Sequence, residues 1–436
     1  MAQVPLAVAS RSYTPLKVAV LVDHRPNHAG EVGGLAGTWE RLSQVACGYP
    51  ELDLTVFFLG ERSQVIPYSD NVRHVLLPPL LGTERLAFLR SIPTHTDLAP
   101  FHPGLFCRLG GFHLLHATDT FHAFAKTALW RARWHHLPLV TSIQTDVIGW
   151  ARIHTPLILQ RLLRGRALVR WLLAHDRYLN YQQRSMERRF GRYLRHCQAV
   201  FISHARDRER VRRLAPSTPS VFWRRGIDAA AFHPCRRERA SVESRFGIPP
   251  GRILLLFVGR LDPVKGVLIA ADVTQELVRR GHDVHLLVVG NGAQRQQVTM
   301  QLGERGTVTG NVPHAELATI YASADLLLFP SEAEVWPNVV MEARACGLPV
   351  VACADGAAHV MRGGGQDGVL LPDRHVQGWI SAVEELVVQP NLRQAMGRRA
   401  RRAVEMQGPS WSQVLTEDLF PVWQDVVMGK SLRALS

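Results

Sequence analysis

The stretch from Tyr321 to Val351 constrains the fold of this chain more than any other. It reads YASADLLLFPSEAEVWPNVVMEARACGLPVV. The apolar run Asp325–Phe329 has the length of a buried strand and is followed by a proline. Pro337 then opens a helical pattern that stops at Gly347, just before a second apolar run. The stretch therefore predicts a strand, a loop, a helix and a strand.

The start of this helix is a candidate binding site. Proline fits the first helical position because its missing N–H would have no partner there. Free backbone donors, from Asn338 and Val339 onward, would then suit a phosphate or a sugar hydroxyl. Glu334 precedes the helix and Glu342 follows eight residues later, so one extended ligand could span both carboxylates. Surface glutamates at this spacing are common, and the pattern alone leaves both interpretations open.

A second candidate lies about seventy residues upstream. Ile253–Val258 reads as another buried strand, and Arg260 and Lys265 follow its carboxyl end, where parallel sheets bind ligands. A planar guanidinium and a point-charge ammonium together suit a diphosphate. An ordinary solvated loop would also carry cations. Lysine is rare, however, with 4 among 51 basic residues, which favours a specific role for Lys265.

Four motifs in register extend this interpretation. The chain carries FVGRLDPVKGV, VVGNGAQRQQV, GNVPHAELATIYASADLLLFPS and EAEVWPNVVMEARACGLPVVA in that order. Over about residues 252–376 it resembles the nucleotide-sugar-binding half of glycosyltransferase family 4, the retaining GT-B enzymes. The resemblance implies that Glu342 holds the ribose of the nucleotide and Glu334 the transferred sugar. It implies that Arg260 and Lys265 hold the diphosphate, beside Asn338 and Val339.

The rest of the chain fits an α/β fold with two Rossmann-like domains facing across a cleft. Strand patterns that alternate with helices predict parallel sheets. We expect an N-terminal acceptor-side domain over residues 1–223, a linker over 224–251, a donor-binding domain over 252–410 and a C-terminal helix over 411–436 that packs back on the first domain. The strands expected in the first domain are Leu16–Val22, Leu52–Phe58, Val72–Leu77, Phe112–His116, Pro138–Ile143 and Ala199–Ile202.

A glycine-dense loop follows the first strand and precedes a helix expected over Gly34–Ala46. It does not match the GxGxxG fingerprint, so the sequence gives little support for NAD binding. In the resembled family this loop faces the diphosphate across the cleft, which makes Gly33 and Gly34 donor-site candidates. A plain strand-to-helix turn would need the same glycines.

Three positions depart from the family pattern. Gln144 stands in SIQTD where the family usually has a histidine, and glutamine cannot carry a proton at neutral pH. Gln144 and Asp146 are our candidates for orienting the sugar and the acceptor. Pro337 stands where the family usually has a glycine. His359 lies near the position where the family often has a glutamate.

Several classes of protein are disfavoured. The first twelve residues carry no signal-peptide pattern, and no uncharged apolar window is long enough to span a membrane. The six cysteines show no CxxC spacing, which argues against zinc and against a disulfide framework. We expect a cytoplasmic protein that needs no metal and no cofactor, since the nucleotide sugar is a substrate.

A strongly basic segment, residues 151–215, carries sixteen arginines and four acidic residues, or +12 of the chain's net +14. On a helix, one stripe of arginines would oppose an apolar face. Three interpretations remain open: a solvated helix face, contact with an anionic membrane surface at the inner face of the membrane, and binding of a soluble anionic acceptor or polyanion. No nucleic-acid module is recognisable. The stripe comprises Arg166, Arg170, Arg177, Arg184, Arg188, Arg192 and Arg195.

The function expected from the resemblance is retaining transfer of a hexose from a UDP- or GDP-sugar to an acceptor hydroxyl, with Glu334, Arg260 and Lys265 as the catalytic candidates. A lipid or glycolipid at the membrane surface is one candidate acceptor. A nucleotide-sugar epimerase or hydrolase, and a binding protein with weakened catalysis, are the alternatives. The sequence does not identify the sugar, the base or the acceptor.

Overall fold

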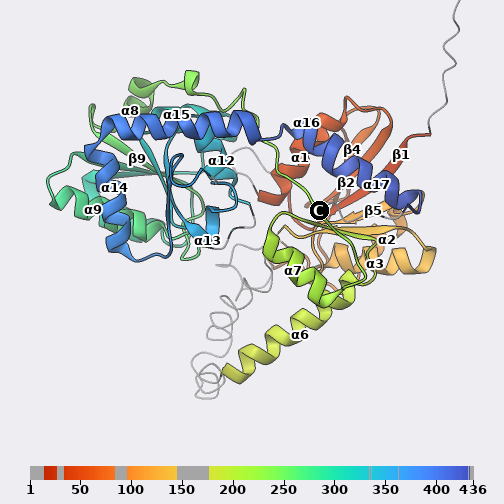
Figure 1. Ribbon diagram of the computed structural model, residues 1–436. Helices are drawn as coiled ribbons and strands as arrows, with labels where there is room; N and C mark the ends of the chain where they lie inside the picture. Colours follow the sequence, from red (N-terminus) through yellow and green to blue (C-terminus); the bar gives the residue numbers. More distant parts are fainter. Residues whose placement is uncertain are drawn as a thin grey trace, which may run out of the picture.

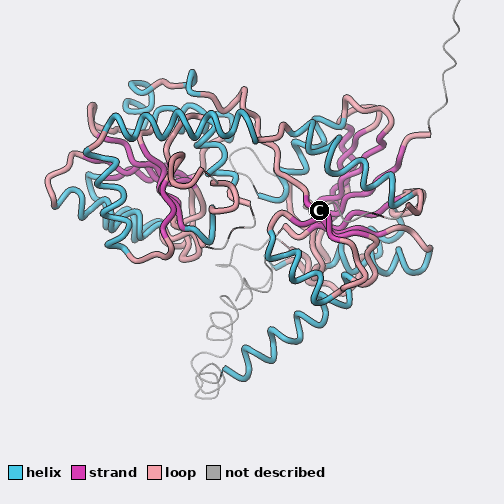
Figure 2. Tube along the Cα trace, viewed as in Figure 1, coloured by secondary structure: helices cyan, strands magenta, loops and turns pink. Residues whose placement is uncertain are grey.

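The computed structural model describes residues 14–26, 34–83, 96–144, 176–332, 334, 336–361, 363–430 and 432, and omits the side chains of 176–180. Within this part of the chain the strands form two separate sheets, each between helices (Figures 1 and 2). Gly33, Asp146, Arg166 and Arg170 of the expected site and stripe lie outside the described residues, as does the side chain of Arg177.

The first sheet has eight strands in the order β3-β4-β2-β1-β5-β6-β7-β8. Every pairing is parallel except that of β3 with β4, which is antiparallel and lies at the sheet edge. The strands are β1 Leu16–Val22, β2 Leu52–Leu59, β3 Gln64–Pro67, β4 Val72–Leu77, β5 Leu114–Ala117, β6 Leu139–Ser142, β7 Ala199–Ile202 and β8 Ser220–Phe222.

The second sheet has six strands in the order β11-β10-β9-β12-β13-β14, all paired in parallel. Its two central strands, β9 and β12, are those that precede the predicted donor-site residues. The strands are β9 Ile253–Val258, β10 Val284–Val289, β11 Gly306–Gly310, β12 Leu326–Phe329, β13 Val350–Cys353 and β14 Val369–Leu371.

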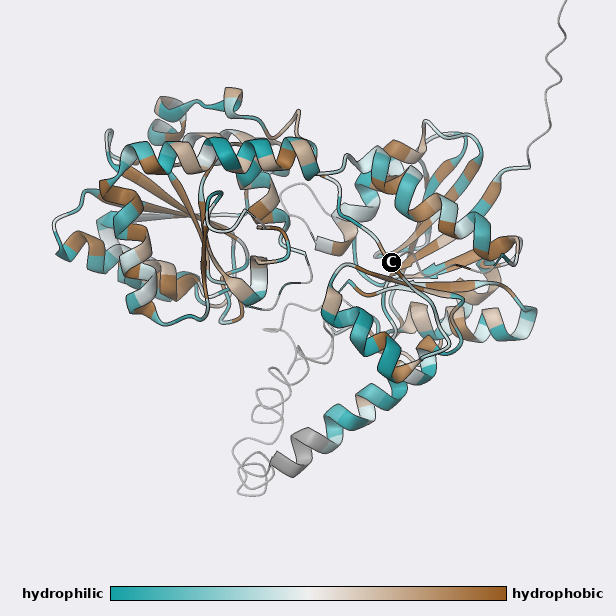
Figure 3. Ribbon diagram, viewed as in Figure 1, coloured by the Kyte–Doolittle hydropathy of each residue, from teal (hydrophilic) through white to brown (hydrophobic). Residues whose placement is uncertain are grey.

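Helices cover both faces of each sheet, because the strands are apolar on both faces. In β1, Val18 and Val20 pack with α1 and the C-terminal helices, whereas Ala19 and Leu21 pack with α2, α3 and the end of α6. The brown strands in Figure 3 show this apolar centre in both domains. The helices of the first domain are α1 Gly34–Ala46, α2 Pro103–Arg108, α3 Ala123–His135, α6 Asp176–Leu194 and α7 Ala205–Leu214.

In the second domain one face carries α8, α11 and α12, and the other carries α9, α10 and α14. The long helix α15 runs from this domain toward the first (Figure 1). The helices are η3 Pro234–Arg236, α8 Arg239–Phe246, α9 Val267–Arg279, α10 Arg295–Leu302, η4 Gly303–Arg305, α11 His314–Ser323, α12 Asn338–Ala345, α13 Ala354–Ala357, α14 Val376–Val388 and α15 Pro390–Gln407.

The C-terminal segment packs on the first domain, as expected. It consists of α16 Trp411–Gln413, a π-helical stretch η5 Val414–Leu419 and α17 Phe420–Val427, so the single expected helix contains a π turn. Trp423 is fully buried among first-domain side chains. Its Nε1 donates to Nδ1 of His116 on β5 at 3.3 Å. Burial lowers the pKa of His116 to about 3, which keeps the ring neutral and able to accept.

Gly290 and Gly226 are among the positions where two segments approach too closely for any side chain. A Cβ on Gly290 would lie 1.9 Å from the carbonyl oxygen of Gly259, so the loops that follow β9 and β10 touch through their backbones. A Cβ on Gly226 would lie 2.5 Å from the ring of Trp411, where the linker between the domains meets the returning chain.

Candidate functional site

The predicted site residues lie at the carboxyl ends of the strands. Arg260 follows β9, Glu334 follows β12, and Gln144 follows β6 in the other sheet. In open parallel sheets this edge binds ligands. The two domains also touch here, since the rings of His204 and His359 lie 5.0 Å apart between centroids.

Glu342, on α12, is almost completely buried, with 2% of its surface exposed. Its Oε2 accepts a hydrogen bond from the hydroxyl of Tyr321 at 3.2 Å, and its Oε1 lies 2.9 Å from Nε2 of His314. Burial, followed by the charge of Glu342, raises the pKa of Tyr321 well above its ordinary value, so the phenol stays a donor. The carboxylate is thereby held in one orientation.

The first domain reaches this carboxylate through Arg41 of α1. Its Nη2 lies 3.8 Å from Oε1 of Glu342 and 2.6 Å from Nε2 of His314. Arg41 lies outside the four motifs, and His314 lies within GNVPHAELATIYASADLLLFPS but was not singled out there. Their role follows from the way α1 faces α11 and α12 across the cleft.

The structure brings Lys265 and Glu334 together as an ion pair. Ser331 donates from its hydroxyl to the same carboxylate oxygen at 2.7 Å. The side chain of Asp262 binds the other side of this loop: one oxygen accepts from the amide of Lys265 at 3.0 Å, and the other lies 3.2 Å from Nη2 of Arg260. The two predicted cations are therefore held on one ordered loop.

Arg374 joins this loop to the end of β12. Its guanidinium donates to the backbone carbonyls of Pro330 at 2.6 Å and of Pro263 at 3.1 Å, and also to that of Val264. It fixes the β9 loop, which carries Lys265, against the strand end that leads to Glu334. Sequence reasoning missed Arg374 because nothing in its own neighbourhood points to a ligand.

The amino end of α12 differs from the expectation of free backbone donors. The helix begins at Asn338, with Pro337 before it rather than inside it. The amide of Asn338 donates to the carbonyl of Trp336 at 3.1 Å, and that of Val340 to the carbonyl of Pro337 at 3.0 Å. Since the preceding turn uses these donors, within the described chain the first turn offers the amide of Val339.

On the first domain, α1 begins at Gly34, whose φ of +84° lies in the left-handed region that glycine adopts without strain. Gln144 is half-buried, and its Nε2 donates to the hydroxyl of Ser142 at 2.7 Å. Its Oε1 accepts from Nη2 of Arg225 at 2.8 Å. The amide is thus oriented from both ends.

A buried charged cluster, Asp23, Asp119 and His122, was not predicted. Asp23 follows β1, Asp119 follows β5, and Nδ1 of His122 lies 3.2 Å from Oδ1 of Asp119. Burial acts to lower the pKa of His122, but Asp119 raises it to about 9. Burial also raises the pKa of Asp23 to about 7. Asp119 and His122 are three residues apart, but Asp23 lies far from both in sequence, and no local motif joins all three.

A pocket of about 1110 Å³ lies between the domains. It is lined from the first domain by Arg41, from the second by His314, Asn338 and Glu342, and from the linker by Asp228. Its size fits a small molecule rather than a water cluster. Glu342 is the predicted ribose ligand and forms part of its wall.

Two Rossmann-like domains with strand ends meeting across a cleft, and a final helix returning to the first domain, define the GT-B fold. Residues 239–403 match the family described as Glycosyl transferases group 1. The match includes the segment over which the sequence resembled glycosyltransferases, and it confirms that resemblance at the level of Glycosyl transferases group 1.

Among curated proteins, the chain is similar to the D-inositol 3-phosphate glycosyltransferase of Segniliparus rotundus, with 34% identity over 182 residues. The alignment spans 40% of each protein. Among solved structures, sucrose-phosphate synthase from Thermosynechococcus elongatus superimposes with a TM-score of 0.69 at 17% identity, over 95% of this chain and all of that one. HepE from Anabaena in complex with UDP-glucose gives 0.60 at 16%, over 95% and 99%. These structural likenesses establish the fold.

Proposed function

We propose that this protein is a glycosyltransferase that moves a sugar from a nucleotide diphosphate sugar to an acceptor hydroxyl. The observation that carries the proposal is the set of Arg260, Lys265, Glu334 and Glu342 on ordered loops and a helix at the carboxyl edge of the second sheet. The family match of that domain supports it, as does the UDP-glucose bound by the structural neighbour HepE.

In the proposed reaction the bond between the sugar and the diphosphate breaks while a bond to the acceptor oxygen forms. Negative charge develops on the leaving phosphate, and Arg260 and Lys265 stabilise it electrostatically. These two cations serve where other enzymes use a metal ion. The departing phosphate lies on the same face as the incoming hydroxyl and takes its proton, so the configuration of the sugar is retained.

The ion pair between Lys265 and Glu334 holds both groups in place before substrate binds. When the diphosphate arrives, Lys265 turns to it and Glu334 is released to accept from a sugar hydroxyl. Glu342, held by Tyr321, accepts from the ribose hydroxyls. Charge-assisted hydrogen bonds of this kind are roughly twice as strong as neutral ones.

The test is a screen of UDP- and GDP-linked sugars for thermal stabilisation of the full chain, followed by transfer assays with the donor that binds. Glu342→Gln should raise the Kd of that nucleotide about 10-fold. Glu276→Gln on α9, which pairs with the exposed Arg279 away from the site, should leave the Kd unchanged. If the chain binds the nucleotide but transfers sugar to no acceptor, it is a binding protein. If it breaks down the donor without an acceptor, it is a hydrolase.

We also propose that the acceptor is met at an anionic membrane surface, through the exposed arginines of α6. The apolar side of that helix packs on the first domain, with Phe190 and Tyr193 buried. Arg184, Arg188 and Arg192 are exposed on the other side. Since the apolar side is already covered, the contact is electrostatic, at about 1 kcal/mol per basic residue before screening.

No helix among the described residues is long and apolar enough to cross a bilayer. Replacing Arg184, Arg188 and Arg192 together by glutamine should abolish co-sedimentation with vesicles that contain anionic lipid, and salt should do the same to the native protein. Replacing the exposed Arg398, Arg399 and Arg402 of α15 is the control for charge alone. Equal sedimentation of both variants would contradict the assignment to α6.

A further inference from the structure

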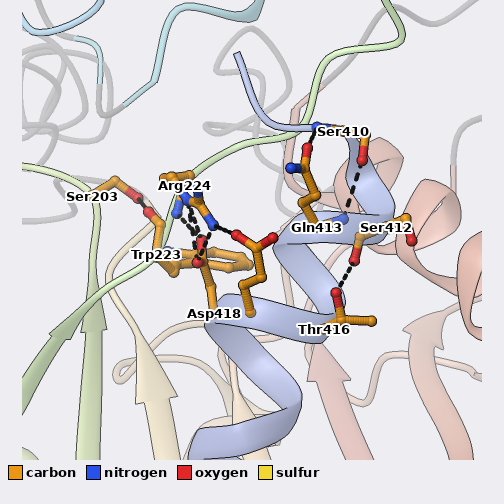
Figure 4. Close-up of polar contacts among 9 residues, drawn as sticks. Ser203, Trp223, Arg224, Ser410, Ser412, Gln413, Thr416 and Asp418 are labelled. Carbon is orange, nitrogen blue, oxygen red and sulfur yellow. Dashed lines mark hydrogen bonds and ion pairs between the residues drawn. The ribbon is translucent and has the colours of Figure 1, made fainter. Parts of the chain in front are cut away.

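Two consecutive arginines of the linker, Arg224 and Arg225, have opposite surroundings. Arg224 is neutralised by the C-terminal segment: its Nη2 lies 2.7 Å from Oδ1 of Asp418 and 2.6 Å from Oε2 of Glu417 (Figure 4). Its backbone amide donates to Asp418 as well. This arginine ties the linker to the returning helix.

Arg225 is buried, with 5% of its surface exposed, and it has no carboxylate partner in the described chain. Its Nη1 donates to the hydroxyl of Thr38, and its Nη2 to the amide oxygen of Gln144 at 2.8 Å. The guanidinium lies 4.7 Å from the centre of the Trp223 ring. Its Nε is buried and shows no hydrogen-bond acceptor among the described residues.

Among the described residues, Arg225 therefore contacts neutral groups alone. Burial, together with the nearby charge of Arg41, lowers its pKa to about 9, and it remains a cation at neutral pH. A buried charge without a counter-charge destabilises a fold by several kcal/mol. Such groups are seldom kept in a protein interior unless a partner neutralises them.

The position of Arg225 indicates where that partner comes from. Thr38 lies one turn inside α1, the helix that begins at Gly34, and Gln144 follows the carboxyl end of β6. Thr38 and Gln144 both lie on the first domain's side of the cleft, whereas Arg260 and Lys265 lie on the second domain. The two oxygens bound to Arg225 belong to side chains, and the side chain of Gln144 is half-buried.

We propose that Arg225 binds an anionic oxygen, from a phosphate or carboxylate group, that a substrate brings into the cleft. The inference rests on the proposed function and names the chemistry of one of its substrates. The anion takes the place of the Gln144 carbonyl on the guanidinium, and the Gln144 amide group then donates to the same anion. Two sources supply this chemistry: the diphosphate of the donor, or an anionic group on the acceptor.

The first arm of the test compares UDP binding by the native chain, Arg225→Gln and Arg224→Gln. A rise in Kd of about 10-fold or more in Arg225→Gln alone assigns the anion to the donor diphosphate. Arg225→Lys, which keeps the charge, should recover part of the affinity. Arg224→Gln should bind as the native chain does and melt at a lower temperature, because it loses a neutralised pair.

The second arm titrates inorganic phosphate against chloride at matched ionic strength with UDP saturating, so that the donor phosphates are already bound. Added thermal stabilisation of the native chain that is absent in Arg225→Gln assigns the anion to the second substrate. If Arg225→Gln keeps both the native Kd for UDP and the native response to phosphate, the inference is wrong. If neither UDP nor GDP binds the native chain, the proposed function fails, and the phosphate titration without nucleotide still decides the role of Arg225.

Discussion

Lys265 pairs with the half-buried Glu334, and its expected ligand is the donor diphosphate. Lys265→Ala should lower kcat/KM at least about 100-fold, because one of two cations facing the leaving group is lost. Ser331 still binds Glu334, so the free energy of unfolding should change by less than about 1 kcal/mol. Steady-state kinetics and chemical denaturation measure both. Lys430→Ala, a surface pair with Asp425 at 3.6 Å, is the control, and native turnover by Lys265→Ala would contradict the assignment.

The Asp23, Asp119 and His122 cluster makes stability depend on pH. The pKa of His122 is raised to about 9, so its contribution is complete below about 6.5 and is lost as the pH rises through 9. The raised pKa of Asp23, about 7, works in the same direction, with its contribution lost as the pH rises through 7.

We therefore expect the melting temperature to fall between about pH 6 and pH 9.5, by the equivalent of about 3 kcal/mol. His122→Gln should be less stable at pH 6 and should lose less on going to pH 9.5. Differential scanning calorimetry across this range is the measurement. Exposed His375→Gln should retain the native profile, and a native profile in His122→Gln would exclude the cluster as its source.

For single residues, the sequence predicts a role where the residue belongs to a local motif. Arg260, Lys265, Glu334 and Glu342 could be named because each lies a few residues from a strand or helix signal. Arg225 could not be named, because its role depends on which side chains the fold places in contact with it. The distances among these four side chains depend on the conformations of the loops, which the sequence does not reveal.

Among the elements, the C-terminal helices show how one side chain fixes a long-range contact. Trp423 is fully buried and bonded to His116. Trp423→Ala should destabilise the first domain by about 3–5 kcal/mol, through the cavity it leaves and the lost partner of His116. Urea denaturation should show the loss, whereas Trp134→Ala, 70% exposed on α3, should show none. Equal stability of the two variants would mean that the C-terminal segment is not bound there.

Elements with a strong apolar period were predictable, and β1, β7, β9 and α1 have the expected bounds. The edge strand β3 was missed because its side chains are largely exposed, which leaves no apolar alternation to read. The amino end of α12 was predicted wrongly for a different reason. Its amides are used by the preceding turn, a local backbone geometry that residue types do not specify.

For the whole molecule, the contact of Arg41 with His314 and Glu342 joins the domains in the absence of ligand. Arg41→Ala should increase the radius of gyration of the free chain, because interfaces between domains are small and a single charged contact shifts their opening. Small-angle X-ray scattering is the measurement. Arg73→Ala, paired with Asp53 inside the first domain at 2.9 Å, is the control. An unchanged radius in Arg41→Ala would show that other contacts hold the domains.

The chain passes between the domains twice, once through the linker and once before Trp411. These two passages touch, since the amide of Ile227 donates to the carbonyl of Pro409 at 2.9 Å. Two adjoining covalent connections permit bending about the line that joins them and resist torsion of one domain against the other. Opening should therefore follow a single angular coordinate, and a nick in either passage should leave the halves attached but free to twist.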